Sequence, residues 1–217
     1  MSARDGIGMT SERTRLRMIE ALRRDGITDE RVLAAMMEIP RHRFVDEGIA
    51  SRAYEDVALP IGHGQTISSP YTVALMTQLL LEKQPLGKVL EIGTGCGYQT
   101  AVLARLVKEV YTLERITGLM DKARRHLRDL RFYNVRYKHV DGHAGYPEGA
   151  PYDGILMAAS ATHVPEALKQ QLAVGGRMVL PVGTEDQWLY VVDRKESGFV
   201  EQKREAVRFV PLLPGLA

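Results

Sequence analysis

The stretch VLEIGTGCGYQTA, residues 89–101, decides the fold. It begins as a short run typical of a buried strand, and glycines then stand at alternate positions, 93, 95 and 97. A strand that turns through glycines directly into a helix is typical of the first unit of a doubly wound α/β sheet. In such sheets the ligand lies outside the carboxyl ends of the strands. A tight turn without a ligand is the alternative interpretation of the glycines alone.

Strand-like and helical segments alternate along the chain after this motif, which predicts a mostly parallel sheet in a Rossmann-like, doubly wound fold. The expected strands are residues 88–92, 107–113, 135–140, 154–157 and 177–182. The expected helices between them are residues 98–105, 116–130 and 165–172. Two further strand-like segments, 188–194 and 205–210, are expected to pair antiparallel at the end of the sheet.

The N-terminal part of the chain is predicted to be helical. Apolar residues at helical spacing predict a helix over 11–24, and Asp29 is expected to cap a second helix that ends before Pro40. The stretch that follows, up to Tyr71, has no sustained period and is expected to form a loop with one short extended piece. We predict a single domain over 1–217, with a helical part at 1–57 and a substrate loop plus cofactor-binding sheet at 58–217.

Composition and charge favour a soluble cytoplasmic protein. Hydrophobic residues make up 45% of the 217 residues, and the net charge of +2 arises from interspersed acids and bases, so no polyanionic partner is indicated. The single cysteine, Cys96, cannot form an internal disulfide, and residues 68–81 are too short to span a bilayer. The positions where a signal peptide would need apolar residues include Arg4, Asp5, Glu12 and Arg13. We expect a monomer that binds neither membrane nor nucleic acid.

The glycine turn and an acid at the end of the next strand predict an adenosyl cofactor. Glu114 lies 21 residues after Gly93, at the tip of the second expected strand, where a carboxylate can accept from both ribose hydroxyls. The Gly-x-Gly-x-Gly spacing differs from the pattern that brings a helix N-terminus onto a pyrophosphate. Glu91 would repel a diphosphate but suits the ammonium and sulfonium groups of S-adenosylmethionine. We therefore favour S-adenosylmethionine, with S-adenosylhomocysteine as product, over a nicotinamide cofactor.

Further candidates lie on the same rim of the sheet. Asp141 and Gly142 follow the third expected strand, where an aspartate can accept from the adenine amino group, and a solvated turn is the alternative. Arg115, next to Glu114, is also expected to contact the cofactor. No metal is expected, because His139, Asp141 and His143 have no second ligand cluster to join them. Cys96 is expected to pack rather than to react.

Four stretches make the chain resemble the protein-L-isoaspartate (D-aspartate) O-methyltransferase family. They are VLAAMMEIPRHRFVDE at 32–47, ALPIGHGQTISSPYTVALMTQLL at 58–80, the glycine motif, and LPVG with AVRFVPL near the end. The glycine motif occurs in many methyltransferases, whereas GQTIS followed by proline is characteristic of this family. The resemblance implies methyl transfer to the free carboxylate of L-isoaspartyl residues, and of D-aspartyl residues, in damaged proteins. The ester can then revert through a succinimide to normal aspartate.

By this resemblance Ser68 matches the active-site serine of the family. An isoaspartyl carboxylate is already ionised at neutral pH and needs no general base, so the main task is to hold it about 3 Å from the methyl group. A serine hydroxyl is suited to grip that carboxylate, while Thr66 and Ile67 are expected to wall the cofactor. Capping of the helix that begins at Pro70 is the alternative role, which we assign to Ser69 rather than Ser68.

The segment AVRFVPL resembles the part of the family that closes over the substrate peptide. Val207 and Arg208 are therefore candidates for substrate contacts, and an edge strand with alternating polarity is the alternative. Val140 stands where the family pattern has glycine, and ILMAASATHVP at 155–165 replaces a stretch richer in proline and alanine. Both departures are expected to loosen or reshape the adenine pocket.

Two other functions compete with this one. A nucleic-acid methyltransferase is the second enzymatic hypothesis, because the basic residues at 13–17 and 122–128 could face phosphates, although a solvated helix face explains them equally. Residues 158–161 read AASA, whereas amino-directed DNA enzymes carry an Asn- or Asp-Pro-Pro-aromatic tetrad there. A fold kept only for interaction would have lost the cofactor positions, which are intact.

Overall fold

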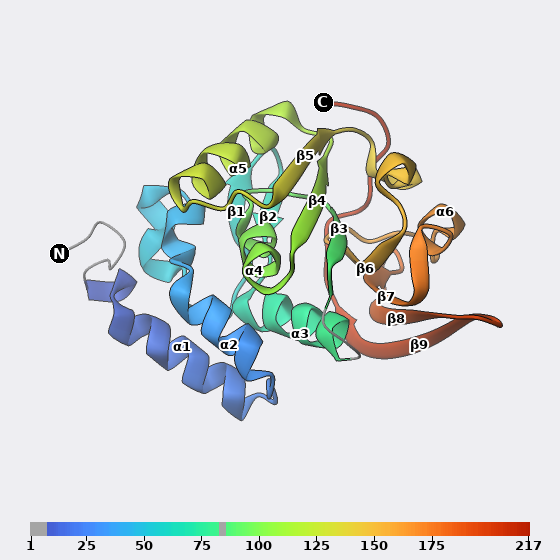
Figure 1. Ribbon diagram of the computed structural model, residues 1–217. Helices are drawn as coiled ribbons and strands as arrows, with labels where there is room; N and C mark the ends of the chain where they lie inside the picture. Colours follow the sequence, from blue (N-terminus) through green and yellow to red (C-terminus); the bar gives the residue numbers. More distant parts are fainter. Residues whose placement is uncertain (1–7, 83–85) are drawn as a thin grey trace.

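The computed structural model describes residues 8–82 and 86–217 (Figure 1). Arg4 and Asp5, which counted against a signal peptide, lie outside these residues. The main sheet has the strand order β5-β4-β3-β6-β7-β8-β9. The strands are β3 Lys88–Ile92, β4 Glu109–Glu114, β5 Val135–His139, β6 Tyr152–Met157, β7 Leu172–Val182, β8 Gln187–Lys195 and β9 Gly198–Val207. Strands β3 to β7 run parallel, and β8 and β9 are antiparallel, so the predicted fold class is confirmed.

The order of the strands reverses beside β3. Strand β3 pairs with β4 on one side and with β6 on the other, and Val89 is opposite Val110 and Gly154 in the two pairings. The carboxyl ends of these three strands therefore meet at one edge of the sheet. Such a reversal point is where open α/β sheets bind their ligands.

The two faces of the sheet are covered unequally (Figure 1). Helices α3 Pro70–Leu81, α4 Tyr98–Leu106 and α5 Thr117–Asp129 cover one face, and the other carries the short helix α6 Glu166–Lys169 with the 3₁₀ turns η4 Gly142–Ala144 and η5 Pro147–Gly149. Successive strand residues point to opposite faces, so Val89 packs toward the three helices and Leu90 toward the other side. Both residues are fully buried. The alternation builds two apolar cores on one sheet.

The N-terminal part forms an outer layer against α3 and α4. It comprises η1 Gly8–Thr10, α1 Glu12–Arg24, α2 Glu30–Glu38, η2 Arg41–Phe44 and η3 Glu47–Arg52. Asp29 caps α2 by accepting from the backbone N–H of Arg31 at 2.9 Å, as predicted. Within the described residues no helix is both long and apolar enough to cross a membrane.

The segment before α3 contains more structure than the sequence indicates. It holds a two-stranded hairpin, β1 Leu59–Gly62 and β2 Gln65–Ile67, instead of one extended piece. The turn passes through His63 and Gly64, both with positive φ. Ser69 caps α3, because its hydroxyl accepts from the backbone N–H of Thr72 at 3.3 Å. Hairpin and cap together fix the chain from 65 to 69 at the carboxyl edge of the sheet.

Three predicted boundaries are wrong, and one of them is the start of the strand expected over 177–182, because β7 begins at Leu172. The helix expected over 165–172 is limited to α6, because Leu172 already pairs with Tyr152 as the first residue of β7. The strand expected over 205–210 is β9, which begins much earlier after a turn of two residues and ends at Val207. Residues 201–205 are all polar and exposed, so this edge strand lacks the apolar alternation that identifies strands in a sequence.

Candidate active site

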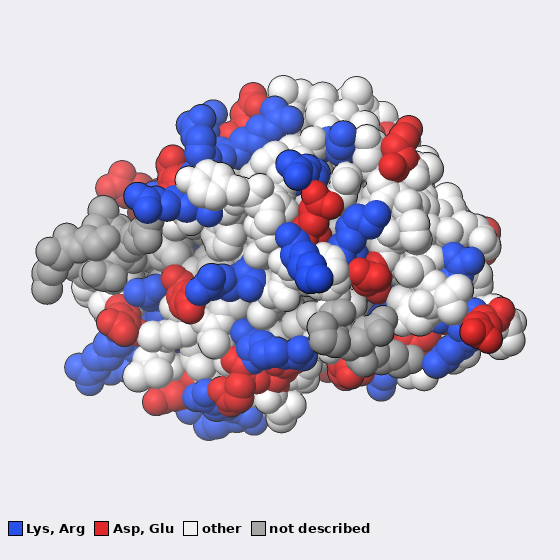
Figure 2. Space-filling model, viewed as in Figure 1, with Lys and Arg blue, Asp and Glu red and all other residues white. Residues whose placement is uncertain are grey.

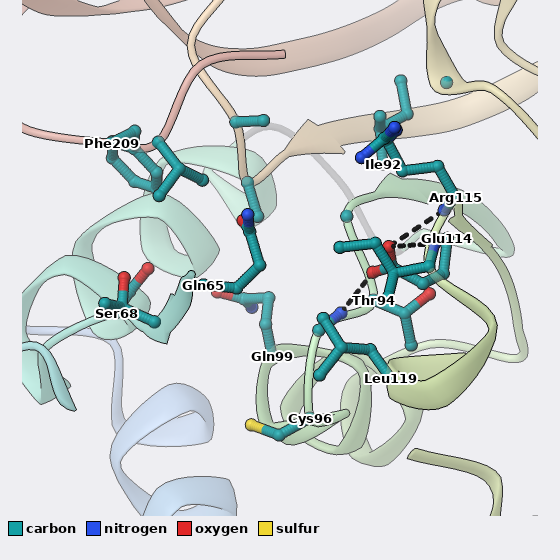
Figure 3. A pocket seen from close by; sticks show the side chains of 18 of the residues that line it. Gln65, Ser68, Ile92, Thr94, Cys96, Gln99, Glu114, Arg115, Leu119 and Phe209 are labelled. Carbon is teal, nitrogen blue, oxygen red and sulfur yellow. Dashed lines mark hydrogen bonds between the residues drawn. The ribbon is translucent and has the colours of Figure 1, made fainter. Parts of the chain in front are cut away.

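A cleft opens at the edge of the sheet where β3, β4 and β6 end (Figure 3). Its walls come from residues 65–68, the glycine turn, the residues after β4 and β6, and a roof formed by residues 209–213. The predicted site residues that line it are Thr66, Ile67, Ser68, Gly93, Gly95, Glu114, Arg115 and Gly142.

The glycine turn has two different functions. Gly95 has a φ of 55° and lies so close to the hairpin that a Cβ there would approach Ile61 Cδ1 to 3.3 Å. Gly97 has a φ of 90°, and a Cβ there would lie 3.1 Å from Ala123 Cβ on α5. Gly97 therefore permits helix packing and does not line the cleft, whereas Gly93 and Gly95 present backbone to it.

Glu114 ends β4 and faces the cleft with a carboxylate held by backbone donors. One oxygen accepts from the N–H of Gly95 at 2.8 Å, and the other accepts from Arg115 and Ile116 at 2.9 and 3.0 Å. A carboxylate offers about four acceptor sites, so capacity remains for a ligand hydroxyl. Figure 3 shows Glu114 on one side of the pocket and Ser68 on the other.

Glu91 lies in the interior between sheet and helix rather than in the cleft. One carboxyl oxygen accepts from the hydroxyls of Thr100 and Thr112 at 2.5 and 2.6 Å, and the other has no hydrogen-bond partner. Burial raises the pKa of Glu91 to about 8, although these two hydrogen bonds act in the opposite direction. The carboxyl is therefore mainly protonated at neutral pH. Contrary to the expectation from its charge, Glu91 is not brought to the cofactor cleft.

Asp141 caps η4 and holds the segment that follows the roof. One oxygen accepts from the backbone and ring of His143, at 2.9 and 2.7 Å, and the other accepts from the N–H of Gly215 at 2.6 Å. Partial burial would raise the pKa of Asp141, but these hydrogen bonds outweigh it and lower the pKa to about 2. Asp141 does not line the cleft itself, because its oxygens are directed to these donors.

The roof is joined to both sides of the cleft. Leu212 donates its N–H to Ser160 and Ser160 donates its own to Val210, each at 2.8 Å. The Arg115 side chain donates to the carbonyl of Gly215 at 2.7 Å. Arg115 therefore lines the cleft while its guanidinium holds the end of the chain.

A second groove meets the cleft at Ser68. It is lined by Ser68 together with Val207 and Arg208, the two residues expected to contact substrate, and by Tyr71 and Glu205. Thr66, Ala158, Phe209 and Val210 border both cavities. The hydroxyl of Ser68 makes no hydrogen bond to any described residue. It can therefore form a hydrogen bond to a ligand where the two cavities join.

Several lining residues were not identified from the sequence. Ala158 and Ala159 follow β6, and the strand-end rule that found Glu114 could have found them. Val140, whose departure from the family pattern was noted, does line the cleft. Residues 209–212 of the roof belong to the AVRFVPL segment that the resemblance placed over the substrate peptide. Their place on the cofactor cleft was not expected, because it depends on contacts with Ser160. Other lining residues are Ile61, Gln65, Val73, Met76, Ile92, Thr94, Cys96, Tyr98, Gln99, Leu113, Ile116 and Leu119.

Nothing in the described part of the chain assembles three or more metal-binding side chains. His139 contacts the carbonyl of Arg115 at 3.0 Å, whereas His143 contacts Asp141. Cys96 is buried and free, and burial raises the pKa of its thiol to about 11, which is the environment of a packing residue.

The lining fits S-adenosylmethionine. Gly93 and Gly95 present bare backbone, Glu114 retains acceptor capacity beside them, and Leu119 and the roof add apolar surface. A doubly wound sheet with such a turn after its first strand and an acid ending the second fits an adenosyl cofactor. The Gly-x-Gly-x-Gly spacing, without the argument from Glu91, favours the class of methyltransferases that use S-adenosylmethionine over dinucleotide-binding enzymes.

Comparison with known proteins identifies the particular family. The family described as protein-L-isoaspartate(D-aspartate) O-methyltransferase matches residues 13–216, and the chain belongs to it. It is 61% identical to the protein-L-isoaspartate O-methyltransferase of Methylobacillus flagellatus, covering 99% of this chain and 98% of that one. The corresponding protein of Dechloromonas aromatica is 58% identical, with 97% and 98% covered.

Solved structures agree with this assignment. A protein-L-isoaspartate O-methyltransferase structure superposes with a TM-score of 0.84 at 30% identity, covering 93% of this chain and 67% of that one. A Plasmodium falciparum protein, described as a candidate enzyme of the same kind and bound to S-adenosylhomocysteine, gives 0.79 at 27% identity, with 91% and 97% covered. As a member of this family, the chain is an enzyme that methylates isoaspartyl residues of damaged proteins with S-adenosylmethionine.

Proposed function

We propose that Ser68 holds the acceptor carboxylate at the junction of the two cavities, with the cofactor in the cleft and the damaged peptide in the groove. The observation that carries this assignment is the position of Ser68, which lines both cavities with an uncommitted hydroxyl. A hydroxyl donates one hydrogen bond to a carboxylate oxygen and fixes its direction. Ser68 is therefore the residue best placed to aim the acceptor into the cleft.

The chemistry requires orientation rather than proton removal. S-adenosylmethionine supplies a methyl group that is activated by its attachment to a sulfonium. The isoaspartyl carboxylate is already an anion, so its oxygen can form the new C–O bond as the C–S bond breaks and sulfur takes the electron pair. Gly93, Gly95 and Glu114 would hold the cofactor, with Thr66, Ile67 and Gly142 around it. The apolar roof at 209–213 excludes water from the reacting atoms.

The groove suits an extended peptide. Val207 is the last residue of the edge strand β9 and Arg208 follows it, so backbone and charge are both available beside Ser68. Asp56 and Glu205 also line this groove. We propose Val207 and Arg208 as contacts to the residues that flank the damaged site, which would have to be in a flexible segment to enter.

We further propose that the chain acts as one domain, as a cytoplasmic monomer, without nucleic-acid or membrane partners. The N-terminal helices share one apolar core with α3 and α4, which supports a single unit. Lys and Arg alternate with Asp and Glu over the face shown in Figure 2. On α5, for example, Lys122 lies 2.8 Å from Asp46 and Arg124 lies 3.8 Å from Asp121. Such interleaving supports a solvated surface rather than a phosphate-binding one.

The test uses synthetic peptides of one sequence that differ only at the acceptor, which is L-isoaspartyl, D-aspartyl or normal L-aspartyl. Each is incubated with methyl-labelled S-adenosylmethionine and then treated with mild base. We expect label on the isoaspartyl peptide and release of that label as methanol, which identifies a carboxyl ester. The D-aspartyl peptide tests the second acceptor in the family description, and normal aspartate should remain unlabelled.

Other results would change the proposal in defined ways. Label on normal aspartate would contradict selectivity for the damaged linkage. Label that resists base would mean that the product is not an ester. Labelling of nucleic acid in place of peptide would preserve the cofactor site and overturn the role given to the groove.

A further inference from the structure

Arg41 is a fully buried arginine without a carboxylate partner among the described residues. Its Nε donates to the carbonyl of Ala53 at 2.8 Å, and its Nη2 donates to the carbonyl of Ser68 at 2.7 Å. The guanidinium carbon lies 4.8 Å from the centre of the Tyr98 ring. The third nitrogen, Nη1, has no hydrogen-bond partner.

This arrangement is costly for folding alone. Removing a guanidinium from water carries a penalty of several kcal/mol, which buried charges usually offset through an opposite charge. Two carbonyls and an aromatic face offset part of it here. Burial lowers the pKa of Arg41, which reflects the same penalty, yet arginine stays charged in proteins. The charge of Asp56, which lines the groove, acts on the guanidinium without forming an ion pair with it, so Arg41 has no direct counter-ion among the described residues.

The position of this charge connects it to the reaction. The acceptor of Nη2 is the backbone carbonyl of Ser68, and the other face of the same residue opens on the cleft and the groove. Tyr98, which lies against the guanidinium, also lines the cleft. Its hydroxyl is buried and has no hydrogen-bond partner either. The two groups act on each other, because the Arg41 charge opposes the rise that burial causes in the pKa of Tyr98, and Arg41 joins this pair to Ser68.

We propose that Arg41 is a positioning residue that fixes the Ser68 backbone and supplies the positive charge that attracts the acceptor carboxylate. The inference rests on the proposed place of that carboxylate beside Ser68. Because methyl transfer converts the anion into a neutral ester, the attraction acts on the substrate and disappears in the product. Arg41 therefore favours binding of the unmethylated residue and release of the methylated one.

The test measures the interaction between the enzyme charge and the ligand charge. One ligand is an isoaspartyl peptide, and the other is the same peptide with a carboxamide in place of the carboxylate. The Kd of each is measured by calorimetry with S-adenosylhomocysteine present, for the wild type and for Arg41→Gln. If that variant does not fold, Arg41→Met is used, because apolar replacement of a buried charge is often tolerated.

A matched control comes from another buried arginine. Arg15 donates to the carbonyls of Met37 and Glu38 at 3.2 and 3.4 Å, lines none of the cavities described, and also has a nitrogen without a partner. Arg15→Gln therefore reproduces the loss of a buried guanidinium in the same helical layer without removing a hydrogen bond to Ser68.

We expect the wild type to prefer the carboxylate peptide and Arg41→Gln to lose about tenfold of that preference. An opposite charge within about 4–6 Å shifts the ionisation equilibrium of a carboxyl group by about ten- to a thousandfold. We expect the lower end of this range, because Ser68 lies between Arg41 and the proposed acceptor site. KM for the isoaspartyl peptide should rise more than kcat falls. An unchanged preference in a folded Arg41 variant, or an equal loss in Arg15→Gln, would overturn the proposal. Absence of any preference in the wild type would instead contradict the acceptor site beside Ser68.

Discussion

The carboxylate of Glu114 accepts a 2.8 Å hydrogen bond from the backbone N–H of Gly95, so the acid that ends β4 also fixes the glycine turn after β3. The two strands are parallel neighbours, which brings their carboxyl ends together. Glu114 therefore shapes the backbone that lines the cleft and offers its own oxygens to the same cleft.

Replacing Glu114 with alanine should weaken cofactor binding by about 1.5–3 kcal/mol, the contribution of one hydrogen bond to a charged group. Calorimetric titration with S-adenosylhomocysteine measures the change directly. Glu109→Gln is the matched control, because Glu109 lies at the opposite end of β4, where it pairs with Arg136 at 2.8 Å. Equal losses in the two variants would show that damage to β4, and not loss of the cleft contact, causes the effect.

Ser68 and Ser69 should have different roles, the first in methyl transfer and the second in stability. Ser68→Ala should reduce methyl transfer by about tenfold or more, because a lost hydrogen bond to the charged acceptor is worth about 1.5–3 kcal/mol, while cofactor affinity stays nearly constant. Ser69→Ala removes the cap of α3 and should lower the free energy of unfolding by about 1 kcal/mol with a smaller effect on transfer. Urea unfolding and initial rates distinguish them. The assignment fails if Ser69→Ala reduces the rate more than Ser68→Ala.

Local sequence patterns encode some features of the candidate site and not others. Gly93, Gly95 and Glu114 could be placed because a strand-end rule converts sequence position into spatial position. The rule fixes the backbone and not the direction of a side chain, so it could not show that Glu91 turns inward to Thr100 and Thr112. Charge alone suggested a contact that burial prevents.

Features made by distant contacts could not be predicted. The link from Arg41 to Ser68 joins residues 27 positions apart, and the link from Asp141 to Gly215 joins residues 74 apart. Neither produces a periodicity or a spacing motif. The edge strand β9 was misplaced for a related reason, since its backbone pairing with β8 compensates for polar side chains.

The inward position of Glu91 predicts a particular dependence of stability on pH. Its pKa is raised from about 4.5 in the unfolded chain to about 8 in the folded protein. Between these values the folded state binds the proton and the unfolded state does not, so this residue lowers stability as pH rises from about 4.5 to about 8. Below that window its contribution is constant, and above it the loss is complete.

Glu91→Gln should remove this dependence. Relative to the wild type, the variant should gain at least about 1.4 kcal/mol of unfolding free energy between pH 5 and pH 8, the equivalent of one pKa unit. Urea titrations at the two pH values provide the comparison, and Glu109→Gln serves as the control, because Glu109 is only half-buried and pairs with Arg136 on the neighbouring strand. A parallel pH profile for the variant and the wild type would mean that Glu91 is ionised in the folded protein. The affinity of Glu91→Gln for the cofactor should also fall less than the affinity of Glu114→Ala.

The contacts of Asp141 and Arg115 predict that the roof over the cleft depends on its anchors at residue 215. Asp141→Ala removes the acceptor of the Gly215 N–H and should accelerate hydrogen exchange over residues 212–217 by about tenfold or more, since a bond to a charged acceptor is worth about 1.5–3 kcal/mol. S-adenosylhomocysteine should dissociate faster as well, because residues 209–213 form one wall of its cleft. Asp153→Ala is the control, since Asp153 accepts from the N–H groups of Gly87 and Lys88 at the opposite edge of the sheet. Unchanged exchange over 212–217 in Asp141→Ala would mean that Arg115 and Ser160 hold the roof without it.

Because the pKa of Asp141 is about 2, the anchor should also persist down to about pH 3, and exchange corrected for its intrinsic pH dependence should stay constant above that value.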